Sequence, residues 1–403
     1  MTFKDLQVDP RCLQLLEKQG ILEPTPVQAQ AIPIALEGRD LVSVAQTGTG
    51  KTLAFGLSAI TRLKNAPRDH TAMLVLAPTR ELAQQVHEVI KPLAKAVKLT
   101  TACVYGGVGM APQVQALRRG AQIVVATPGR LLDHVGRGNT RFRKLQVLVL
   151  DEADRMLDMG FLPDIKRIIN ELPKERQTMM FSATFPWEVE RLTTDFMNDP
   201  ARVEIGLKAQ PADAVRQAVY TVAPNRKLDL LHDILIKDEV SSTVVFVRTK
   251  RSTDRVAEML ANRGFKAEAI HGGHTQGRRQ RAIDGFRKGR HKILVATDVA
   301  ARGLDVQGIT HVINYDIPAT PDDYVHRIGR TARASADGDA ITFVSITDAR
   351  ELHNIERAIG REIDRVKWEG ELFIASGQKR KGFGGGGRGG RRGRFNTGVR
   401  RRY

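Results

Sequence analysis

The stretch Ala45-Gln46-Thr47-Gly48-Thr49-Gly50-Lys51-Thr52 decides how the rest of the sequence is interpreted. It follows a short apolar run, Leu41–Val44, and precedes a segment of helical composition, Leu53–Leu63. The expected order is a strand, a glycine-rich turn and a helix start. Such a turn lets backbone N–H groups close around phosphate oxygens, while Lys51 adds a full positive charge and the Thr52 hydroxyl can reach Mg²⁺. The stretch therefore predicts a nucleotide phosphate site.

The first position of this motif departs from the strict pattern, which begins with Gly where the chain has Ala45. The Gly50-Lys51-Thr52 end is intact, and this favours phosphate binding. A surface turn rich in glycine and threonine is the alternative, because short motifs recur by chance.

A second polar run, Asp151-Glu152-Ala153-Asp154, directly follows the apolar segment Leu145–Leu150. A carboxylate such as Asp151 at a strand end, in the same domain as the phosphate turn, is typical of a Mg²⁺ ligand. Glu152 beside it could orient and activate a water molecule. Acidic residues also favour the first turn of a helix, so a helix cap is the alternative. The pairing with the phosphate turn favours catalysis.

Length and composition predict two domains and a tail. The 403 residues exceed one ordinary domain, and 41% hydrophobic residues are ample for buried cores. No apolar run approaches the roughly 18 residues of a membrane span. The start, Met1–Leu6, lacks the charged-then-apolar pattern of a signal peptide. Cys12 and Cys103 have no metal-ligand spacing, so we expect reduced thiols and a cytoplasmic location.

The net charge of +18 is unevenly placed. From Ser376 to Tyr403 there are 10 Lys or Arg residues and no acid, while the remaining residues carry 53 basic and 45 acidic side chains. A basic body with a more basic tail suggests a polyanion as partner. The tail is rich in Arg and Gly, which suits binding to single strands. A spacer that only aids solubility is the alternative for the tail.

Short apolar runs alternate with amphipathic segments in the first half of the chain. Residues 1–40 are expected to form helical turns broken by Pro24, Pro26 and Pro33. Helical periodicity marks segments such as Glu81–Ala96 and Gly160–Leu172. The candidate strands are Leu41–Val44, Met73–Ala77, Ile123–Ala126, Val147–Leu150 and Met179–Ser182. Continuous apolar strands separated by helices predict a parallel sheet covered on both faces.

The polar stretch from Gly206 to Arg216 lacks periodicity and contains Pro211, so we interpret it as a linker. The alternation then resumes with the candidate strands Val219–Val222, Val244–Val247, Ala267–Ile270, Ile293–Ala296, His311–Tyr315 and Ile341–Ser345. The second α/β domain has no phosphate turn of its own, so we expect a ligand in the cleft between the domains. The predicted boundaries are 1–207 for the first domain, 208–215 for the linker, 216–375 for the second domain and 376–403 for a disordered tail.

Several further motifs follow one another in a specific order. They are Pro24-Thr25-Pro26-Val27-Gln28, Pro78-Thr79-Arg80-Glu81-Leu82, Gly106-Gly107, Thr127-Pro128-Gly129-Arg130, Ser182-Ala183-Thr184, Ala296–Asp305 and Tyr324–Arg333. With the phosphate turn and the acidic run, they make the chain resemble the DEAD-box ATP-dependent RNA helicases over about residues 3 to 370. The resemblance implies two tandem RecA-like domains, each a mostly parallel sheet covered by helices, with ATP and Mg²⁺ between them.

The resemblance also implies roles for residues on both sides of the cleft. Gln28 would read the adenine edge and Phe3 would stack on the base. Arg327 and Arg330 would contact the γ-phosphate, with Arg330 as the arginine finger. The predicted catalytic residues are Lys51, Glu152, Arg327 and Arg330, and Thr52 and Asp151 are the predicted Mg²⁺ ligands. The predicted nucleotide contacts are Phe3, Thr25, Gln28, Ala45, Gln46, Thr47, Gly48, Thr49, Gly50, Lys51, Thr52, Asp151, Asp305, Arg327 and Arg330.

RNA contacts are implied in both domains, and they address the backbone with little sequence preference. The predicted RNA-contacting residues are Pro78, Thr79, Arg80, Gly107, Thr127, Arg130, Arg248, Thr249, Gln276, Arg279, Thr297 and Arg302. Ser182, Thr184 and His326 are predicted to couple the nucleotide site to strand separation.

Three positions depart from the family pattern. Ile21 stands where the family usually has an aromatic residue, Gly273 where many members have Asp, and Ala332 where Gly is usual. The compact chain, the Met159–Pro163 run and the basic tail resemble the bacterial RhlE-like subgroup.

The resulting expectation is an RNA-stimulated ATPase that separates short RNA duplexes. An RNA clamp or annealing protein whose ATP cycle only regulates grip is one alternative, and a DNA-directed motor is another. Partners in RNA processing or ribosome assembly fit this expectation, but the sequence does not name them.

Overall fold

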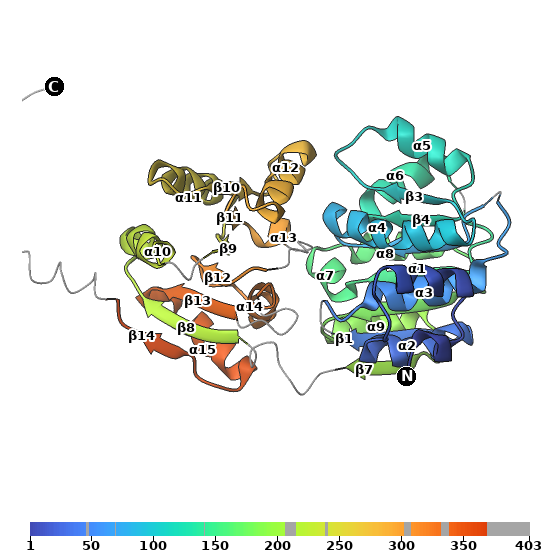
Figure 1. Ribbon diagram of the computed structural model, residues 1–403, viewed down its shortest axis with the longest axis horizontal. Coiled ribbons are helices and arrows are strands. Elements are labelled where there is room, and N and C mark those ends of the chain that lie inside the picture. Colours follow the sequence, from blue (N-terminus) through green and yellow to red (C-terminus); the bar gives the residue numbers. More distant parts are fainter. Residues whose placement is uncertain are drawn as a thin grey trace, which may run out of the picture.

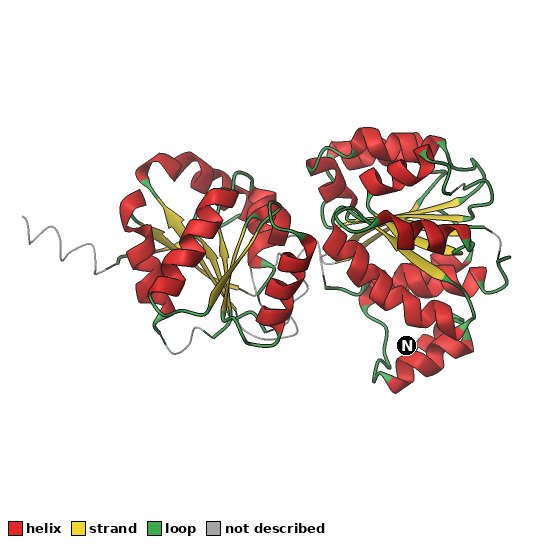
Figure 2. Cartoon of the chain, turned by 90° about the horizontal axis from the view of Figure 1, so that it is seen from above, coloured by secondary structure: helices red, strands yellow, loops and turns green. Residues whose placement is uncertain are grey.

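The computed structural model describes residues 1–45, 48–68, 70–140, 142–205, 215–237, 241–301, 308–331 and 338–368. These residues form two α/β domains that lie side by side, with the N-terminus in the first (Figure 1). Each sheet is covered by helices on both faces (Figure 2). The predicted α/β architecture of two tandem domains is therefore confirmed. Among the described helices, none has the length and apolar character needed to cross a membrane.

The first domain contains a sheet with the strand order β3-β4-β2-β5-β6-β1-β7, in which every described strand pair is parallel. Its strands are β1 (Leu41–Ala45), β2 (Met73–Leu76), β3 (Thr101–Val104), β4 (Ile123–Ala126), β5 (Val147–Asp151), β6 (Gln177–Ser182) and β7 (Ala201–Ile205). Its helices are η1 (Phe3–Leu6), α1 (Pro10–Lys18), α2 (Pro26–Leu36), α3 (Lys51–Leu63), α4 (Arg80–Ala96), α5 (Met110–Arg118), α6 (Pro128–Gly136), α7 (Ala153–Asp158), α8 (Leu162–Asn170) and α9 (Trp187–Phe196).

The second domain repeats this plan with the order β10-β11-β9-β12-β13-β8-β14, again with every described pair parallel. Its strands are β8 (Val215–Thr221), β9 (Thr243–Phe246), β10 (Ala267–Ile270), β11 (Ile293–Ala296), β12 (His311–Asn314), β13 (Gly338–Val344) and β14 (Asp364–Val366). Its helices are η3 (Pro224–Arg226), α10 (Lys227–Leu235), α11 (Lys250–Asn262), α12 (Gln276–Arg287), α13 (Asp298–Ala301), α14 (Pro321–Ile328), η4 (Ile346–Asp348) and α15 (Ala349–Ile359).

The central strands are largely apolar because both faces of each sheet are buried. In β5, Val147 and Val149 pack on the face covered by α1 to α4, while Leu148 and Leu150 pack on the opposite face. This alternation explains why the apolar runs predicted β1, β2, β4, β5 and β6 to within about two residues. It also makes the strand ends carry the polar residues.

Three of the strands at the sheet edges were not predicted. β3 and β7 lie at the two edges of the first sheet, and β14 lies at one edge of the second. They are only partly buried or exposed, and they contain residues such as Thr101, Arg202 and Asp364. An edge strand has fewer apolar neighbours, so its sequence lacks a continuous apolar run.

The expectation that Pro33 breaks a helix is wrong, because α2 continues through it to Leu36. Pro26 does mark a boundary, since it is the first residue of that helix. A proline inside a helix loses one backbone hydrogen bond. Ile32 and Ala35 on either side are almost fully buried, so packing outweighs this local cost.

Only the end of the expected linker lies within the described residues. Strand β8 begins at Val215, so Val215 and Arg216 already belong to the second sheet. Most of the predicted linker, the end of the second domain after Trp368 and the whole tail 376–403 lie outside the described residues.

Candidate functional site

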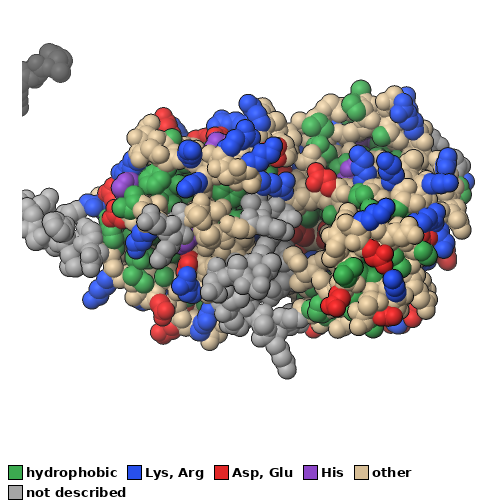
Figure 3. All heavy atoms as spheres, in the orientation of Figure 1, with side chains coloured by type: hydrophobic (Ala, Val, Ile, Leu, Met, Phe, Trp, Pro, Cys, Tyr) green, Lys and Arg blue, Asp and Glu red, His purple; other side chains and the backbone are tan. Residues whose placement is uncertain are grey.

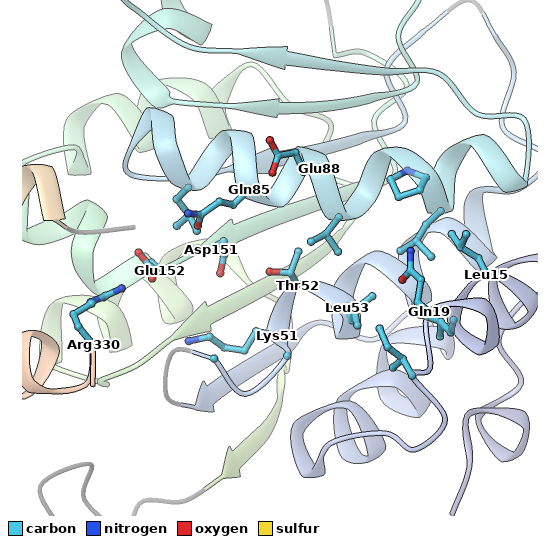
Figure 4. A pocket seen from close by; sticks show the side chains of 18 residues that line it. Leu15, Gln19, Lys51, Thr52, Leu53, Gln85, Glu88, Asp151, Glu152 and Arg330 are labelled. Carbon is cyan, nitrogen blue, oxygen red and sulfur yellow. The ribbon is translucent and has the colours of Figure 1, made fainter. Parts of the chain in front are cut away.

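A cavity of about 470 Å³ opens where the phosphate turn of the first domain faces the second domain. Figure 4 shows that one end of it is charged and that the other end lies against α1. The charged end is lined by Lys51, Thr52, Asp151, Glu152 and Arg330. The apolar end is lined by Leu15, Ile21, Leu53, Val89 and Leu93. The cavity therefore suits a ligand with a polyanionic part and a flat apolar part.

The phosphate turn has the backbone that its glycines predict. Gly48 and Gly50 have φ angles of +85° and +90°, which favour glycine. A Cβ atom at Gly50 would also overlap the Gln28 amide. Lys51 is buried at the start of α3, and its Nζ donates to the carbonyl of Ala45 at 2.6 Å. The turn thus brings a cation and a helix N-terminus to the same end of the cavity.

Residues Pro24–Gln28 brace this turn. Thr25 Oγ1 donates to the carbonyl of Thr49 at 2.7 Å, and Gln28 Nε2 donates to the carbonyl of Gly50 at 3.1 Å. Gln28 Oε1 accepts from the Thr25 N–H at 2.9 Å. Both ends of the Gln28 amide are therefore engaged, and its side chain is buried behind the wall of the cavity.

Phe3 is also placed away from the main cavity. It is buried in η1 and lines a smaller cavity of about 150 Å³ beside Leu13 and Leu22. Leu16 and Ile21 contribute to both cavities, so the two lie next to each other. Of the predicted base-contacting residues, the structure thus puts neither Phe3 nor Gln28 on the wall of the larger cavity.

The acidic run meets the phosphate turn at the carboxyl end of the sheet. Asp151 is the last residue of β5, and Glu152 follows with a φ of +53°, a strained value for a side chain of this kind. Burial, and then the neighbouring Glu152, raise the pKa of Asp151 to about 7, although Lys51 opposes this shift. Glu152 Oε2 accepts from the buried Arg155 Nη1 at 2.6 Å. The structure therefore joins two carboxylates and two cations in one buried cluster.

Asp154 holds the Ser182–Thr184 segment. Its Oδ2 accepts from the backbone N–H groups of Ala183 and Thr184, at 3.1 and 2.8 Å, and from Thr184 Oγ1 at 3.0 Å. Ser182 Oγ accepts from the Asp154 N–H at 3.2 Å. This network ties the end of β6 to the start of α7. The sequence prediction included Ser182 and Thr184 but gave Asp154 no role.

Helix α14 of the second domain reaches this cluster. His326 lies near enough to Arg155 and Asp154 for their charges to shift its pKa. Burial, and then the Arg155 guanidinium, lower the pKa of His326 to about 4, so its ring is neutral at physiological pH. Arg330, two residues after the end of α14, lines the charged end of the cavity. The second domain thus supplies part of the site.

Arg327 is placed differently from Arg330. Its Nε and Nη2 donate to the two carboxylate oxygens of Asp298, at 2.6 and 2.8 Å. Nη1 donates to Asn314 Oδ1 and to the carbonyl of Asp316, and the guanidinium lies 5.0 Å from the centre of the Phe246 ring. Arg327 is therefore fixed within the second domain, and it does not line the cavity that contains Lys51.

Glu81 forms a second bridge between the domains. Its Oε1 accepts from Gln276 Nε2 at 3.2 Å, and its Oε2 lies 2.9 Å from Arg279 Nη2. All three side chains are buried. Sequence reasoning predicted Gln276 and Arg279 as RNA contacts and did not identify Glu81 as their partner.

Other predicted RNA-contacting residues gather at the carboxyl ends of neighbouring strands in the first domain. Pro78 and Thr79 lead into α4, where Thr79 Oγ1 caps the helix by accepting from the Leu82 N–H. The Arg80 guanidinium lies against Gly106 and Gly107 and would overlap a Cβ atom at Gly107. The remaining pair, from the start of α6, is Thr127 at the N-cap and Arg130, which donates to the carbonyl of Val108.

The corresponding edge of the second domain carries the rest of the predicted set. Thr249 caps α11 by accepting from the Ser252 N–H, and the Arg248 N–H donates to Asp316 Oδ2. Thr297 is buried directly after β11. Figure 3 shows Lys and Arg side chains gathered where Figure 1 draws α12. The exposed basic residues in and just after this helix are Arg278, Arg281, Arg287, Lys288 and Arg290.

Some predicted residues have no described position. Gln46 and Thr47 of the phosphate turn, and Arg302 and Asp305 after α13, lie outside the described residues, as does Ala332.

The chain matches two family models, "DEAD/DEAH box helicase" over residues 25–192 and "Helicase conserved C-terminal domain" over residues 226–335. Among its relatives is the DEAD-box ATP-dependent RNA helicase CshA of Geobacillus kaustophilus, with 43% identity over 91% of this chain and 78% of the relative. CshA of Bacillus subtilis is 42% identical over 91% of this chain and 74% of the relative. The similarity to these relatives does not test the resemblance to the RhlE-like subgroup, which stays a prediction.

Solved structures of similar fold have both domains. S. cerevisiae Dbp5 bound to RNA and ADP-BeF3 matches with a TM-score of 0.83 and 32% identity, covering 93% of this chain and 98% of that one. Mss116p bound to single-stranded RNA and AMP-PNP matches with a TM-score of 0.84 and 28% identity, covering 93% and 81%.

Proposed function

The chain belongs to the DEAD-box family of ATP-dependent RNA helicases, and from this we propose how its two domains divide the work. ATP occupies the cavity of about 470 Å³, with its phosphates at the charged end and its base towards the apolar end. The observation that carries the proposal is that Lys51, Asp151 and Glu152 of the first domain share this cavity with Arg330 of the second. A site that needs both domains is complete only when they are together.

The phosphate turn holds the triphosphate through the Lys51 ammonium group and the N–H groups at the start of α3. Lys51 Nζ donates to the backbone carbonyl of Ala45, and a phosphate oxygen can replace that acceptor. Gln28 and Phe3 are our proposed adenine contacts. Because the Gln28 amide also holds the Gly50 carbonyl, pairing of this amide with the base would be transmitted to the phosphate turn.

Mg²⁺ fits the donor set at the charged end. The Thr52 hydroxyl and the buried Asp151 carboxylate both line the cavity, and hard oxygen ligands are those that Mg²⁺ prefers. Burial and the neighbouring Glu152 raise the pKa of Asp151, and a bound cation would favour the ionised carboxylate. When bound, Mg²⁺ would neutralise charge on the phosphate oxygens during transfer.

Hydrolysis then requires a positioned water and compensation for the charge that develops on the phosphate. Glu152 is held by Arg155 at the charged end and can orient the water. Arg330 reaches the same end from the second domain and serves as the arginine finger. Arg327 supports this arrangement by anchoring α14 to Asp298.

RNA runs along the carboxyl edges of both sheets. Arg80, Arg130 and Arg248 lie there with helix N-termini capped by Thr79 and Thr249, and such groups contact phosphates without reading bases. The Asp154 network, with His326 against it, links this edge to the nucleotide. We also propose a cytoplasmic location, in keeping with two free cysteines.

Duplex separation and ATP hydrolysis measured on matched variants test the proposal. Lys51→Ala should weaken ATP binding, whereas Glu152→Gln should keep ATP bound and slow its hydrolysis. Arg330→Ala should lower turnover by roughly 10³-fold with little change in ATP affinity. Lys64→Ala, on an exposed cation beyond the end of α3, is the matched control for charge. If Arg330→Ala retained full turnover, the shared site would be refuted.

A duplex series separates the proposed function from its rivals. Separation of RNA duplexes, but not of DNA duplexes of the same sequence, is expected. RNA-stimulated hydrolysis without separation of any duplex would instead identify an RNA clamp.

A further inference from the structure

Three side chains outside the proposed ATP and RNA sites converge on one point of the second domain. Asp254 comes from α11, and His271 and His274 come from the connection between β10 and α12. His271 Nε2 lies 2.8 Å from Asp254 Oδ2, and His274 Nε2 lies 3.2 Å from Asp254 Oδ1. The two imidazole rings stack with their centres 3.7 Å apart. One carboxylate thus meets two imidazole nitrogens, each on a different oxygen.

The hydrogen bonds fix the protons of these rings. His271 Nδ1 accepts from the Gly273 N–H at 3.1 Å, so the neutral ring carries its proton on Nε2 and donates it to Asp254. Both histidine side chains are more than nine-tenths buried, and His274 Nδ1 is buried with no hydrogen-bond partner. A buried ring nitrogen without a hydrogen-bond partner is costly.

The spacing of the three donor atoms suits a tetrahedral metal ion. All three lie within 4.8 Å of one another. An ion with bonds of about 2.0–2.1 Å to nitrogen and oxygen holds its ligand atoms about 3.3 Å apart. Asp254 is half-exposed, so a water molecule can complete the shell.

We propose that Asp254, His271 and His274 form a Zn²⁺-binding site. The ion takes the Nε2 lone pairs of both histidines and one carboxylate oxygen, and water fills the fourth position. Each neutral ring moves its proton from Nε2 to Nδ1, so no proton leaves the site. Two imidazoles and one carboxylate favour Zn²⁺ over Mg²⁺ and Ca²⁺, which prefer oxygen ligands.

The loop between β10 and α12 can supply the hydrogen-bond acceptor that His271 Nδ1 needs after this proton shift. A metal-bound histidine normally donates its other N–H to an acceptor, but His271 Nδ1 faces the Gly273 N–H. The His274 N–H donates to the carbonyl of His271, which closes a turn with Gly272 and Gly273 at its centre. Rotation of the peptide unit between Gly272 and Gly273 turns the Gly273 N–H away from His271 Nδ1. The Gly272 carbonyl then faces this nitrogen and can accept its proton. Such a rotated turn needs a positive φ at its third residue, which Gly273 supplies at little cost.

The site lies directly before a helix that bridges the domains. Thr275 caps α12, and Gln276 and Arg279 in its first turn contact Glu81 of the first domain. An ion on His271 and His274 therefore fixes the backbone that presents these contacts.

Titration of the full chain with Co²⁺ and Zn²⁺ tests the site, without nucleotide and with excess Mg²⁺ to fill oxygen-ligand sites. We expect one Co²⁺ per chain with the visible absorption of a tetrahedral site, and its displacement by Zn²⁺. Loss of a group that only orients a metal ligand costs about 10–100-fold in metal affinity. Asp254→Asn and His274→Asn each remove a proposed ligand, so each should lower the affinity for Zn²⁺ about 100-fold or more. Gly273→Ala should weaken Zn²⁺ binding about tenfold, because its Cβ would lie 3.0 Å from His271 Nδ1 and would disfavour the rotated turn.

His353→Asn is the matched control, since this exposed histidine on α15 lies outside the cluster. It should leave Co²⁺ absorption and Zn²⁺ affinity unchanged. The proposal is overturned if the unaltered chain shows no saturable one-to-one absorption, or if His274→Asn retains it. Melting curves in EDTA establish whether each variant is folded. If Asp254→Asn or His274→Asn fails to fold, Gly273→Ala still tests the site, because it keeps all three ligands.

Discussion

The buried contact between Glu81 and the start of α12 predicts how tightly the two domains close. Arg279→Met leaves the Glu81 carboxylate in the closed form with only the Gln276 amide as partner, since the ion pair at 2.9 Å is lost. Truncating one member of a buried, hydrogen-bonded charge pair costs about 2–5 kcal/mol. At about 1.4 kcal/mol per factor of ten, the closing equilibrium should fall by roughly 30-fold or more.

The two single substitutions should not be equivalent. Burial, opposed by Glu81 and reinforced by Arg80, lowers the pKa of Arg279, so the two arginines repel each other inside the interface. Glu81→Met removes the carboxylate and leaves the repulsion between the two arginines, so it should be the more damaging change. The double variant has no unpaired charge at this contact and should close better than Glu81→Met alone. Arg281→Met, on an exposed arginine of the same helix, is the control.

Energy transfer between dyes on the two domains measures closure in the presence of AMP-PNP and single-stranded RNA. Lys95 on α4 and Arg357 on α15 are exposed and can be replaced by cysteine for labelling. Burial raises the pKa of the native Cys12 and Cys103 thiols to about 11 and about 12, so neither competes well for the dyes. An unchanged closed fraction in Arg279→Met, or strictly additive losses in the double variant, would refute a closing role for this pair.

Three further predictions concern the cluster around the nucleotide and the tail. Burial raises the pKa of Asp151 from 3.8 to about 7. As pH rises, the unfolded chain therefore releases this proton at a lower pH than the folded chain does. The free energy of unfolding falls by up to roughly 4 kcal/mol between about pH 4 and pH 7. Asp151→Asn should therefore melt at a higher temperature than the unaltered chain at pH 8 but not at pH 4, and equal shifts at both pH values would contradict this. Thr184→Val removes one hydrogen bond of 3.0 Å to Asp154, which is worth about 1.5–3 kcal/mol. It should slow duplex separation more than tenfold while ATP turnover changes less than threefold. Equal losses of duplex separation and ATP turnover would argue against coupling. Residues 376–403 carry 10 basic side chains. Deleting them should reduce the slope of log RNA affinity against log salt concentration by roughly 2 to 5, since each phosphate contact contributes about 0.7. An unchanged slope would mean that the tail is only a spacer.

Much of the fold follows from where apolar runs occur. The predicted strands Ile123–Ala126 and Ile293–Ala296 coincide with β4 and β11, because buried parallel strands carry apolar residues on both faces. The meeting of Lys51 with Asp151 was also predictable, since β1 and β5 end at the same edge of one parallel sheet. Both inferences rest on signals within a few residues of sequence.

Contacts between distant residues gave no such signal. Glu81 and Gln276 are 195 positions apart, and nothing in either neighbourhood indicates the other. Arg327 and Arg330 look equivalent in a basic run, yet Arg327 is committed to Asp298 while Arg330 lines the cavity. Gln28 stays a predicted base contact, but the sequence did not indicate that its amide also braces the phosphate turn. In each case the partner of a polar side chain depends on packing between elements, which local sequence does not encode.

The two domains share one strand order but contribute unequally to the active site. The first provides the phosphate turn and the carboxylates Asp151 and Glu152, which concentrate negative charge near Lys51. Adding a triphosphate there increases the negative charge, so a further cation is required. In the proposed mechanism Arg330 supplies that cation from the second domain, while the neutral ring of His326 can pack beside Arg155 without adding to the positive charge. The electrostatic balance therefore makes ATP favour the closed arrangement, and loss of the γ-phosphate on hydrolysis removes part of the reason for the domains to stay together.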